Sequence, residues 1–255
     1  PIEELDGEVQ SALPPLSEEA VIKGVEEGNE RVATVWRIIR HPEDDPSFPF
    51  VDEEYHWKRS KGVIRVIVLN RSGEIIDGPL TVLEERFHLS YPCVFNWEGQ
   101  YYMVPESLGS GQIRLYRARS FPLQWEFEKV LVEGVLACDA TLFEDAHSWW
   151  MYASVRQSPL VPNTNSVSLF YAKTPLGPWV PHQRPIVKSG VGGSRPAGRP
   201  FFLNGSWYRP AQDCSKRYGY AISLNRVECL NPMDYKETEV SKILPLWTKG
   251  LMGAH

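Results

Sequence analysis

The sequence has no long apolar stretch, no excess of basic residues and no strand–helix alternation, and each absence excludes a class of protein. No run of about 18 apolar residues occurs, so we expect no membrane-spanning helix. The net charge of −5 at pH 7 gives no electrostatic footprint for nucleic acid or an anionic membrane. Without strands that alternate with helices, these residues also do not predict a nucleotide-sugar-binding fold.

The four cysteines also lack the pattern of a metal site. Cys93, Cys138, Cys214 and Cys229 stand singly, form no CxxC pair and have no cluster of histidines beside them, which argues against zinc. We predict buried free thiols, with a disulfide between neighbouring sheets as the alternative. The glycine-rich run 189–193 is not followed by a helix, so we interpret it as a flexible connection and not as a phosphate loop. We expect no metal and no cofactor.

The sequence contains one pattern that is repeated three times. Residues 94–103, 142–152 and 201–208 each read as an apolar strand, a polar turn and an aromatic strand. Their central residues Phe95, Phe143 and Phe202 are 48 and 59 residues apart. A period near 50 residues with a hairpin in every copy is typical of the blades of a β-propeller.

We therefore predict an all-β fold, a five-bladed β-propeller over residues 51–255. Its first blade is expected to be degenerate, with strands over 62–69 and 74–83 as the outer half. Whole blades are predicted over 91–132, 139–185 and 198–240, and an incomplete last blade begins at 243. Residues 1–50 form an acidic arm with a short capped helix over 17–22 and a proline-rich loop over 40–50.

Polar residues recur where the predicted inner strands begin and where the following hairpins end. Because inner strands of a propeller line one central channel, we expect these side chains to converge there. A carboxylate pair suits glycoside hydrolysis, and the alternative is that these polar residues hydrogen-bond neighbouring blades and hold the ring closed. The candidate catalytic residues are Glu106, Asp139 and Asp213, and the candidate ligand-binding residues are Arg199, Gln212, Tyr91 and His88.

Several motifs in this order resemble the N-terminal domain of glucosamine inositolphosphorylceramide transferases. The resemblance implies a five-bladed propeller related in architecture to furanosidase- and arabinanase-type glycoside hydrolases. It also implies an accessory domain that, in plant members, precedes a separate glycosyltransferase domain acting on sphingolipids in the Golgi. The motifs are 88–95 (HLSYPCVF), 102–107 (YMVPES), 115–118 (LYRA), 121–125 (FPLQW), 128–131 (EKVL), 175–179 (PLGPW), 198–201 (GRPF), 204–205 (NG), 212–214 (QDC) and 218–219 (YG).

One departure from that family bears on activity. The resemblance implies an Ala-Asp-Pro-Phe strand in the first blade, whose Asp is the general base in the hydrolases. Here residues 45–51 (DPSFPFV) are shortened and interrupted by proline, so the strand of Asp45 is not expected to form. Tyr91 stands where a second hydrolase carboxylate would enter. Inverting hydrolysis requires both an acid and a base, so we expect no hydrolysis.

Three functions remain open at this point. The first is a non-catalytic, carbohydrate-associated propeller that binds or scaffolds, with a glycan or glycolipid as its partner. The second is a structural subunit of a larger assembly, with protein partners bound through the N-terminal arm. The third is a hydrolase-like enzyme that uses the carboxylates of the channel. Fold alone does not decide among them.

Overall fold

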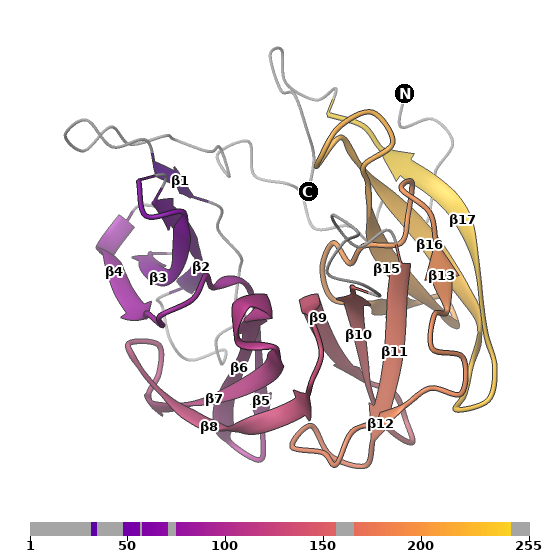
Figure 1. Ribbon diagram of the computed structural model, residues 1–255, viewed down its shortest axis with the longest axis horizontal. Helices are drawn as coiled ribbons and strands as arrows, with labels where there is room; N and C mark the ends of the chain where they lie inside the picture. The colour runs from indigo at the N-terminus through magenta and orange to yellow at the C-terminus, as the bar shows by residue number, and fades with distance from the viewer. Residues whose placement is uncertain (1–31, 35–47, 57, 71–74, 157–165, 246–255) are drawn as a thin grey trace. The chain divides into compact units, whose positions relative to one another are not determined.

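The computed structural model describes residues 32–34, 48–56, 58–70, 75–156 and 166–245. These residues form β-strands in four antiparallel sheets, with one short 3-10 helix, η2 (Leu108–Ser110) (Figure 1). The prediction of an all-β chain is therefore confirmed for the described residues. The chain divides into two compact units, an N-terminal unit up to Ala137 and a C-terminal unit from Cys138 onward.

The first sheet of the N-terminal unit has the order β1 (Val32–Thr34), β2 (Phe48–His56), β3 (Lys61–Leu69) and β4 (Ile75–Leu83). Strands β3 and β4 are the outer half of a blade, as predicted. The inner half corrects the prediction, because residues 48–50 belong to the nine-residue strand β2 and not to a loop. The domain boundary expected between residues 50 and 51 thus falls inside a strand.

Proline is accommodated in β2 because of the way its neighbours pair. Pro49 lies opposite Val68 of β3, whereas β1 pairs with β2 only from Glu54 to His56. On the side away from β3, the described part of the chain places no strand against Pro49. A residue without an N–H is tolerated at such an edge position. Asp45, the predicted helix over 17–22 and most of the predicted last blade lie outside the described residues.

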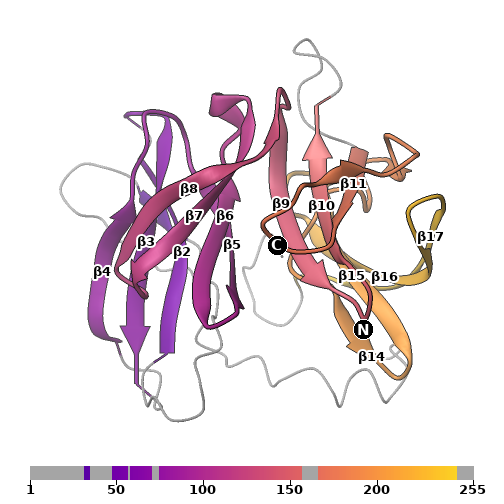
Figure 2. The same cartoon turned by 90° about the horizontal axis from the view of Figure 1, so that it is seen from below.

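The second sheet of the N-terminal unit has the order β5 (Ser90–Trp97), β6 (Gln100–Glu106), β7 (Gln112–Ser120) and β8 (Gln124–Glu133) (Figure 2). A hydrophobic core joins it to the first sheet. Ile64 and Val66 of β3 pack with Leu89 and with Met103 of β6, and all four are fully buried. Each such side chain contributes about 1.5–3 kcal/mol by its removal from water.

The third and fourth sheets make up the C-terminal unit. The third has the order β9 (Ala137–Glu144), β10 (Trp149–Val155), β11 (Ser166–Ala172) and β12 (Val180–Pro181), and β13 (Lys188–Ser189) also pairs with β11. The fourth has the order β14 (Phe201–Leu203), β15 (Ser206–Asp213), β16 (Ala221–Leu230) and β17 (Tyr235–Ile243). Phe143, Tyr152 and Tyr235 connect the two sheets in one aromatic core.

The three sequence repeats are the first hairpins of successive sheets: β5–β6, β9–β10 and β14–β15. Two of them turn on a pair of residues with positive φ, Glu98-Gly99 and Asn204-Gly205. This pair is the signature of the type I′ turn, whose twist matches that of the strands it joins. The third hairpin, β9–β10, turns instead through residues 145–148, where the Asp145 N–H donates to Ser148 O at 3.0 Å.

Candidate functional site

Two of the predicted site residues, Tyr91 and Asp139, share an uncommon backbone conformation. Tyr91 in β5 has φ 44° and Asp139 in β9 has φ 53°. Both side chains are buried. A residue other than glycine in this left-handed region costs about 1–3 kcal/mol and persists only where its surroundings impose it. The inner strands of two sheets thus repeat one strained position, as the matching sequence positions suggested.

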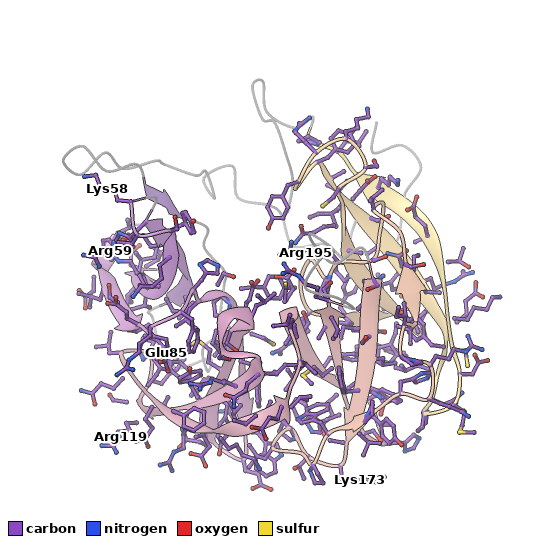
Figure 3. All side chains as sticks on the ribbon, viewed as in Figure 1. Lys58, Arg59, Glu85, Arg119, Lys173 and Arg195 are labelled. Atoms are coloured by element: carbon purple, nitrogen blue, oxygen red, sulfur yellow. The ribbon has the colours of Figure 1, made fainter. Side chains whose placement is uncertain are left out.

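The carboxylate of Asp139 is held by Arg195. The Arg195 Nε donates to Asp139 Oδ2, and Nη2 donates to Oδ1 at 3.3 Å. The Asp139 side chain is 2% exposed and that of Arg195 15%. Figure 3 shows Arg195 within the C-terminal unit, near the start of β9. A bidentate pair of this kind commits both oxygens of the carboxylate.

The same pairing stabilises the charge of Arg195. Burial opposes the charged guanidinium, but the Asp139 carboxylate outweighs that effect, and the pKa of Arg195 lies above its ordinary value. The Cζ of Arg195 also lies 5.1 Å from the ring centre of Tyr218. That ring is 56% exposed. Arg195 therefore joins a buried carboxylate to an aromatic ring at the surface.

The segment that carries Arg195 is anchored along its length, which corrects the interpretation of residues 189–193 as a flexible connection. The backbone N–H of Cys214 donates to Val191 O at 2.7 Å, and that of Gln212 donates to Arg195 O at 2.7 Å. The Ser194 hydroxyl donates to Gly190 O at 2.7 Å. The run packs against the end of β15, since a Cβ on Gly192 would be in ordinary van der Waals contact with Asp213 Oδ1 at 3.6 Å.

A second buried ion pair supports this segment from β15. Arg209 donates to both carboxylate oxygens of Glu237 at 2.7 Å. It also donates to the carbonyls of Gly193 at 2.7 Å and Ser194 at 3.1 Å. The side chains of Arg209 and Glu237 are 1% and 2% exposed. Because burial raises the cost of an unpaired charge, this pair fixes the backbone that leads into Arg195.

Gln212 and Asp213, at the end of β15, also form hydrogen bonds within the fold. Gln212 is 2% exposed and its side-chain amide donates to Pro196 O at 3.2 Å. Asp213 accepts from Lys242 Nζ at 2.8 Å and from the Ser215 N–H at 2.9 Å. Burial opposes its ionisation, but these hydrogen bonds outweigh burial and lower the pKa of Asp213.

The remaining predicted residues of the N-terminal unit have structural contacts. The His88 Nδ1 accepts the Gly62 N–H at 2.7 Å, and its ring meets that of Tyr55 edge-on at 5.6 Å. Burial lowers the pKa of His88, which favours the neutral imidazole. Glu106 is the last residue of β6, lies opposite Ser90 and is half-buried.

The structure therefore brings Asp139, Gln212 and Asp213 to the C-terminal unit, around the segment of Arg195. Arg199 lies just before β14 in the same unit and is exposed. Sequence reasoning missed Arg195 in favour of Arg199, although both arginines precede a proline (Arg195-Pro196 and Arg199-Pro200). A signal for Arg209 was present, because Arg209 directly follows the third copy of the repeat, and a charge buried there requires a partner.

In chemical terms, this arrangement binds two carboxylates, those of Asp139 and Asp213, to the cationic side chains of Arg195 and Lys242. Glycoside hydrolysis needs one carboxyl group with a raised pKa to protonate the leaving group, and the pKa of Asp213 is shifted the other way. Among the described residues, no group of three or more His, Cys, Asp or Glu side chains gathers as metal ligands would. All four cysteines are free thiols; Cys93 and Cys138 are buried, and Cys214 and Cys229 are half-buried.

Comparison with known sequences finds one family and relatives of the same name. Residues 60–252 match the family described as "Glucosamine inositolphosphorylceramide transferase 1, N-terminal". Glucosamine inositolphosphorylceramide transferase 1 of Oryza sativa subsp. japonica is 42% identical over 161 residues, which are 62% of this chain and 22% of that protein. The Arabidopsis thaliana protein of the same name is 38% identical over 170 residues, 66% of this chain and 22% of that protein. The chain thus spans about a fifth of the length of these relatives.

Comparison with solved structures shows the fold. A β-xylosidase aligns with a TM-score of 0.59 at 15% identity, over 80% of this chain and 73% of the other. An exo-1,5-α-L-arabinanase from a bovine ruminal metagenomic library aligns with a TM-score of 0.57 at 9% identity, over 82% and 78% of the two chains. These likenesses confirm the predicted five-bladed β-propeller class. No helix in the described part of the chain is long and apolar enough to cross a membrane.

Proposed function

The chain belongs to the family of the N-terminal domain of glucosamine inositolphosphorylceramide transferase 1, and from this membership we propose that it is a non-catalytic domain that binds the carbohydrate part of a sphingolipid. The family name describes a transferase that acts on inositolphosphorylceramide. The chain covers 22% of the length of these relatives, and we assign the transfer reaction in their name to the parts of those proteins that it does not cover. We propose the Golgi as the compartment, as the family resemblance implies. Recognition of the lipid's head group is the part that this domain contributes.

The observation that carries the proposal is the bidentate pair of Asp139 and Arg195. A catalytic carboxylate must keep an oxygen available to water or to the leaving group. Both oxygens of Asp139 accept from Arg195 instead. Asp213 is bound to Lys242 with a lowered pKa. Both candidate carboxylates of the C-terminal unit thus act as partners of cations, the half-buried Arg195 and the exposed Lys242, which supports a binding domain over a hydrolase.

Tyr218 and Arg199 are the ligand contacts that we propose. Tyr218 is 56% exposed and is supported by Arg195, which itself is fixed by Asp139. An aromatic ring held in place can stack on the apolar face of a sugar without a further entropy cost. Arg199 is exposed in the same unit and offers the hydrogen-bond donors of a guanidinium. Gln212 is buried beside the segment of Arg195 and supports the site indirectly. Tyr91 and His88 are buried or bonded within the N-terminal unit.

Vesicle co-sedimentation tests this function. The purified chain should pellet with phosphatidylcholine vesicles that contain inositolphosphorylceramide and stay in solution with phosphatidylcholine alone. Vesicles with phosphatidylserine control for charge. Tyr218→Ala should reduce the pelleted fraction at least about fivefold, and Met233→Ala, an equally exposed residue on another turn, should not. Equal pelleting with all three vesicles would exclude recognition of the head group.

Exposed apolar residues favour scaffolding as a second candidate function. Ile75 and Ile76 of the outermost strand β4 are 60% and 57% exposed, and Leu80 is 41% exposed. An edge strand with such residues is a common template for another chain. Here the partner would be a second copy of this chain. Native mass spectrometry of the isolated chain with and without Ile76→Lys would report self-association through this edge.

A further inference from the structure

A pocket of about 370 Å³ lies in the C-terminal unit, away from the residues proposed above to bind the lipid head group. It is formed where the β14–β15 hairpin turns, at the start of β15. Asp213 is at the other end of the same strand, about 20 Å away at about 3.3 Å per residue. The lining residues are Asp145, Phe202, Gly205, Ser206, Trp207, Arg226, Val227, Glu228, Cys229 and Leu230.

One side of this pocket is an aromatic pair. Phe202 and Trp207 are opposite each other in the β14–β15 register, and their rings meet edge-to-face with centres 5.5 Å apart. Trp207 in turn packs on the buried ring of Phe143 at 5.2 Å. Phe202 is 60% exposed. An exposed ring whose partner is fixed from behind is a rigid apolar surface of the kind that binding sites use.

The other side of the pocket is polar and is shaped by a bulge in β16. The register with β17 shifts between Val227 and Cys229, so Glu228 is the additional residue. Its carboxylate lies 3.7 Å from Arg226 and accepts from Lys236 at 2.5 Å. Bulges are over-represented at functional sites because they re-aim a side chain. Glu228 and Arg226 thus place an acceptor and donors near the aromatic pair.

The chemistry of the lining determines the ligand class. Asp145 uses its oxygens within its own turn, on the N–H groups of His147, Ser148 and the Trp150 indole. Its negative charge and that of Glu228 are balanced by Arg226 in the lining and by Lys236, which is paired with Glu228. The lining therefore has no excess positive charge for a phosphate or carboxylate ligand. An aromatic face beside donors and acceptors instead matches an uncharged sugar ring, which has an apolar C–H face and a rim of hydroxyls.

We propose that this pocket binds one or two pyranose units of an uncharged glycan. Its volume is at the lower end of the range of about 300–1,000 Å³ that small-ligand sites occupy. Phe202 stacks on the sugar face, and Arg226 and Glu228 bind its hydroxyls. The site is separate from the surface of Tyr218 and Arg199, so the domain holds a neutral glycan at one end of its fourth sheet and the lipid head group at the other.

Saturation-transfer NMR with methyl β-D-glucopyranoside and with cellobiose tests this site. Both probes should receive saturation from the wild-type chain, and cellobiose should bind more tightly if two rings are accommodated. Glucose 6-phosphate should bind more weakly than the methyl glycoside. Phe202→Ala should weaken binding at least about tenfold, Phe202→Tyr should restore it, and Met233→Ala should leave it unchanged.

Two results would overturn the proposal: no saturation transfer to either neutral sugar, or equal binding by the wild type and Phe202→Ala. Because Phe202 is mostly exposed, the variant is expected to fold, and its thermal unfolding curve verifies this. Vesicle binding by Phe202→Ala separates the two sites. It should match the wild type whether or not the pocket binds sugar, so failure here does not affect the proposed function.

Discussion

Asp139 combines three features that are individually uncommon: a buried carboxylate, a left-handed backbone and a guanidinium bound through two hydrogen bonds. The strained backbone places the Asp139 carboxylate in the interior, and it is tolerated because Arg195 neutralises this carboxylate. Such an arrangement is found at functional sites, but here its effect is to fix the segment before β14 against β9. The residue thus contributes to the site by position and not by proton transfer.

Asp139→Ala should therefore be strongly destabilising. It leaves the Arg195 guanidinium buried without its counter-charge, which costs about 3–5 kcal/mol. Arg199→Ala, which changes an exposed side chain, should cost less than about 1 kcal/mol. Urea unfolding monitored by tryptophan fluorescence measures both. The sequence alone suggested that both residues hold the ring closed, so equal losses in the two variants would favour that first interpretation.

His88 should make stability depend on pH in a defined window. Burial lowers its pKa in the folded state, so just below about pH 6.5, the ordinary value, the unfolded chain binds more protons. The free energy of unfolding must then fall as the pH decreases from about 6.5 and level off below the folded pKa. Unfolding midpoints in urea between pH 7.5 and 5 report this change.

A matched variant isolates the contribution of this one histidine. In His88→Gln, the side-chain oxygen can still accept the Gly62 N–H but does not titrate, so the decrease in stability over this range should be smaller than in the wild type. His147→Gln is the control, because His147 is exposed. If the two variants keep identical pH profiles, the histidine at position 88 is not the group responsible.

At the scale of elements, the interpretation of the segment 190–197 from the sequence was wrong. Its glycines suggested a flexible connection, because the sequence does not show which residues hydrogen-bond to this segment. The partners are Arg209, Gln212 and Cys214, which come from β15 and its following loop and are distant along the chain. Only the three-dimensional pairing of β15 with this segment reveals that its carbonyls are bonded.

The Arg209–Glu237 pair should show strong coupling between β15, β17 and this segment. Glu237→Leu leaves the Arg209 guanidinium buried without its counter-charge and should cost about 3–5 kcal/mol. Arg209→Met should cost less, because Glu237 keeps its ion pair with Lys188 Nζ at 2.8 Å. The double variant removes both charges and should cost less than the sum by at least about 1 kcal/mol. Urea unfolding of the four proteins measures the coupling, and additive losses would contradict the proposed role of the pair.

In strand β2, the local sequence predicted a loop where the structure has a paired strand. Pro46 and Pro49 indicated a loop because proline breaks a strand that is paired on both sides. The residues around Pro49 nevertheless pair with β3, since β1 covers only the far end of β2. Whether a proline faces an open edge depends on its neighbour's length, which no local pattern contains.

At the scale of the whole molecule, much of the fold could be predicted because it is a repeat. Phe95, Phe143 and Phe202 mark the first hairpins of successive sheets. Hydrophobic alternation supports the same answer in every copy, and turn chemistry does so in two of them. The candidate site could be predicted only in part. Positions such as Asp139 and Asp213 followed from the repeat, whereas their partners Arg195 and Lys242 come from other segments, the one before β14 and strand β17.

The account as a whole rests on the claim that this propeller binds carbohydrate without cleaving it. The most direct measurement is the release of 4-nitrophenol from 4-nitrophenyl α-L-arabinofuranoside and β-D-xylopyranoside, compared between the wild type and Asp139→Asn. We predict no release above the rate of the buffer in either protein. Release by the wild type that disappears in a folded Asp139→Asn variant would contradict the account, because it would make Asp139 a catalytic group.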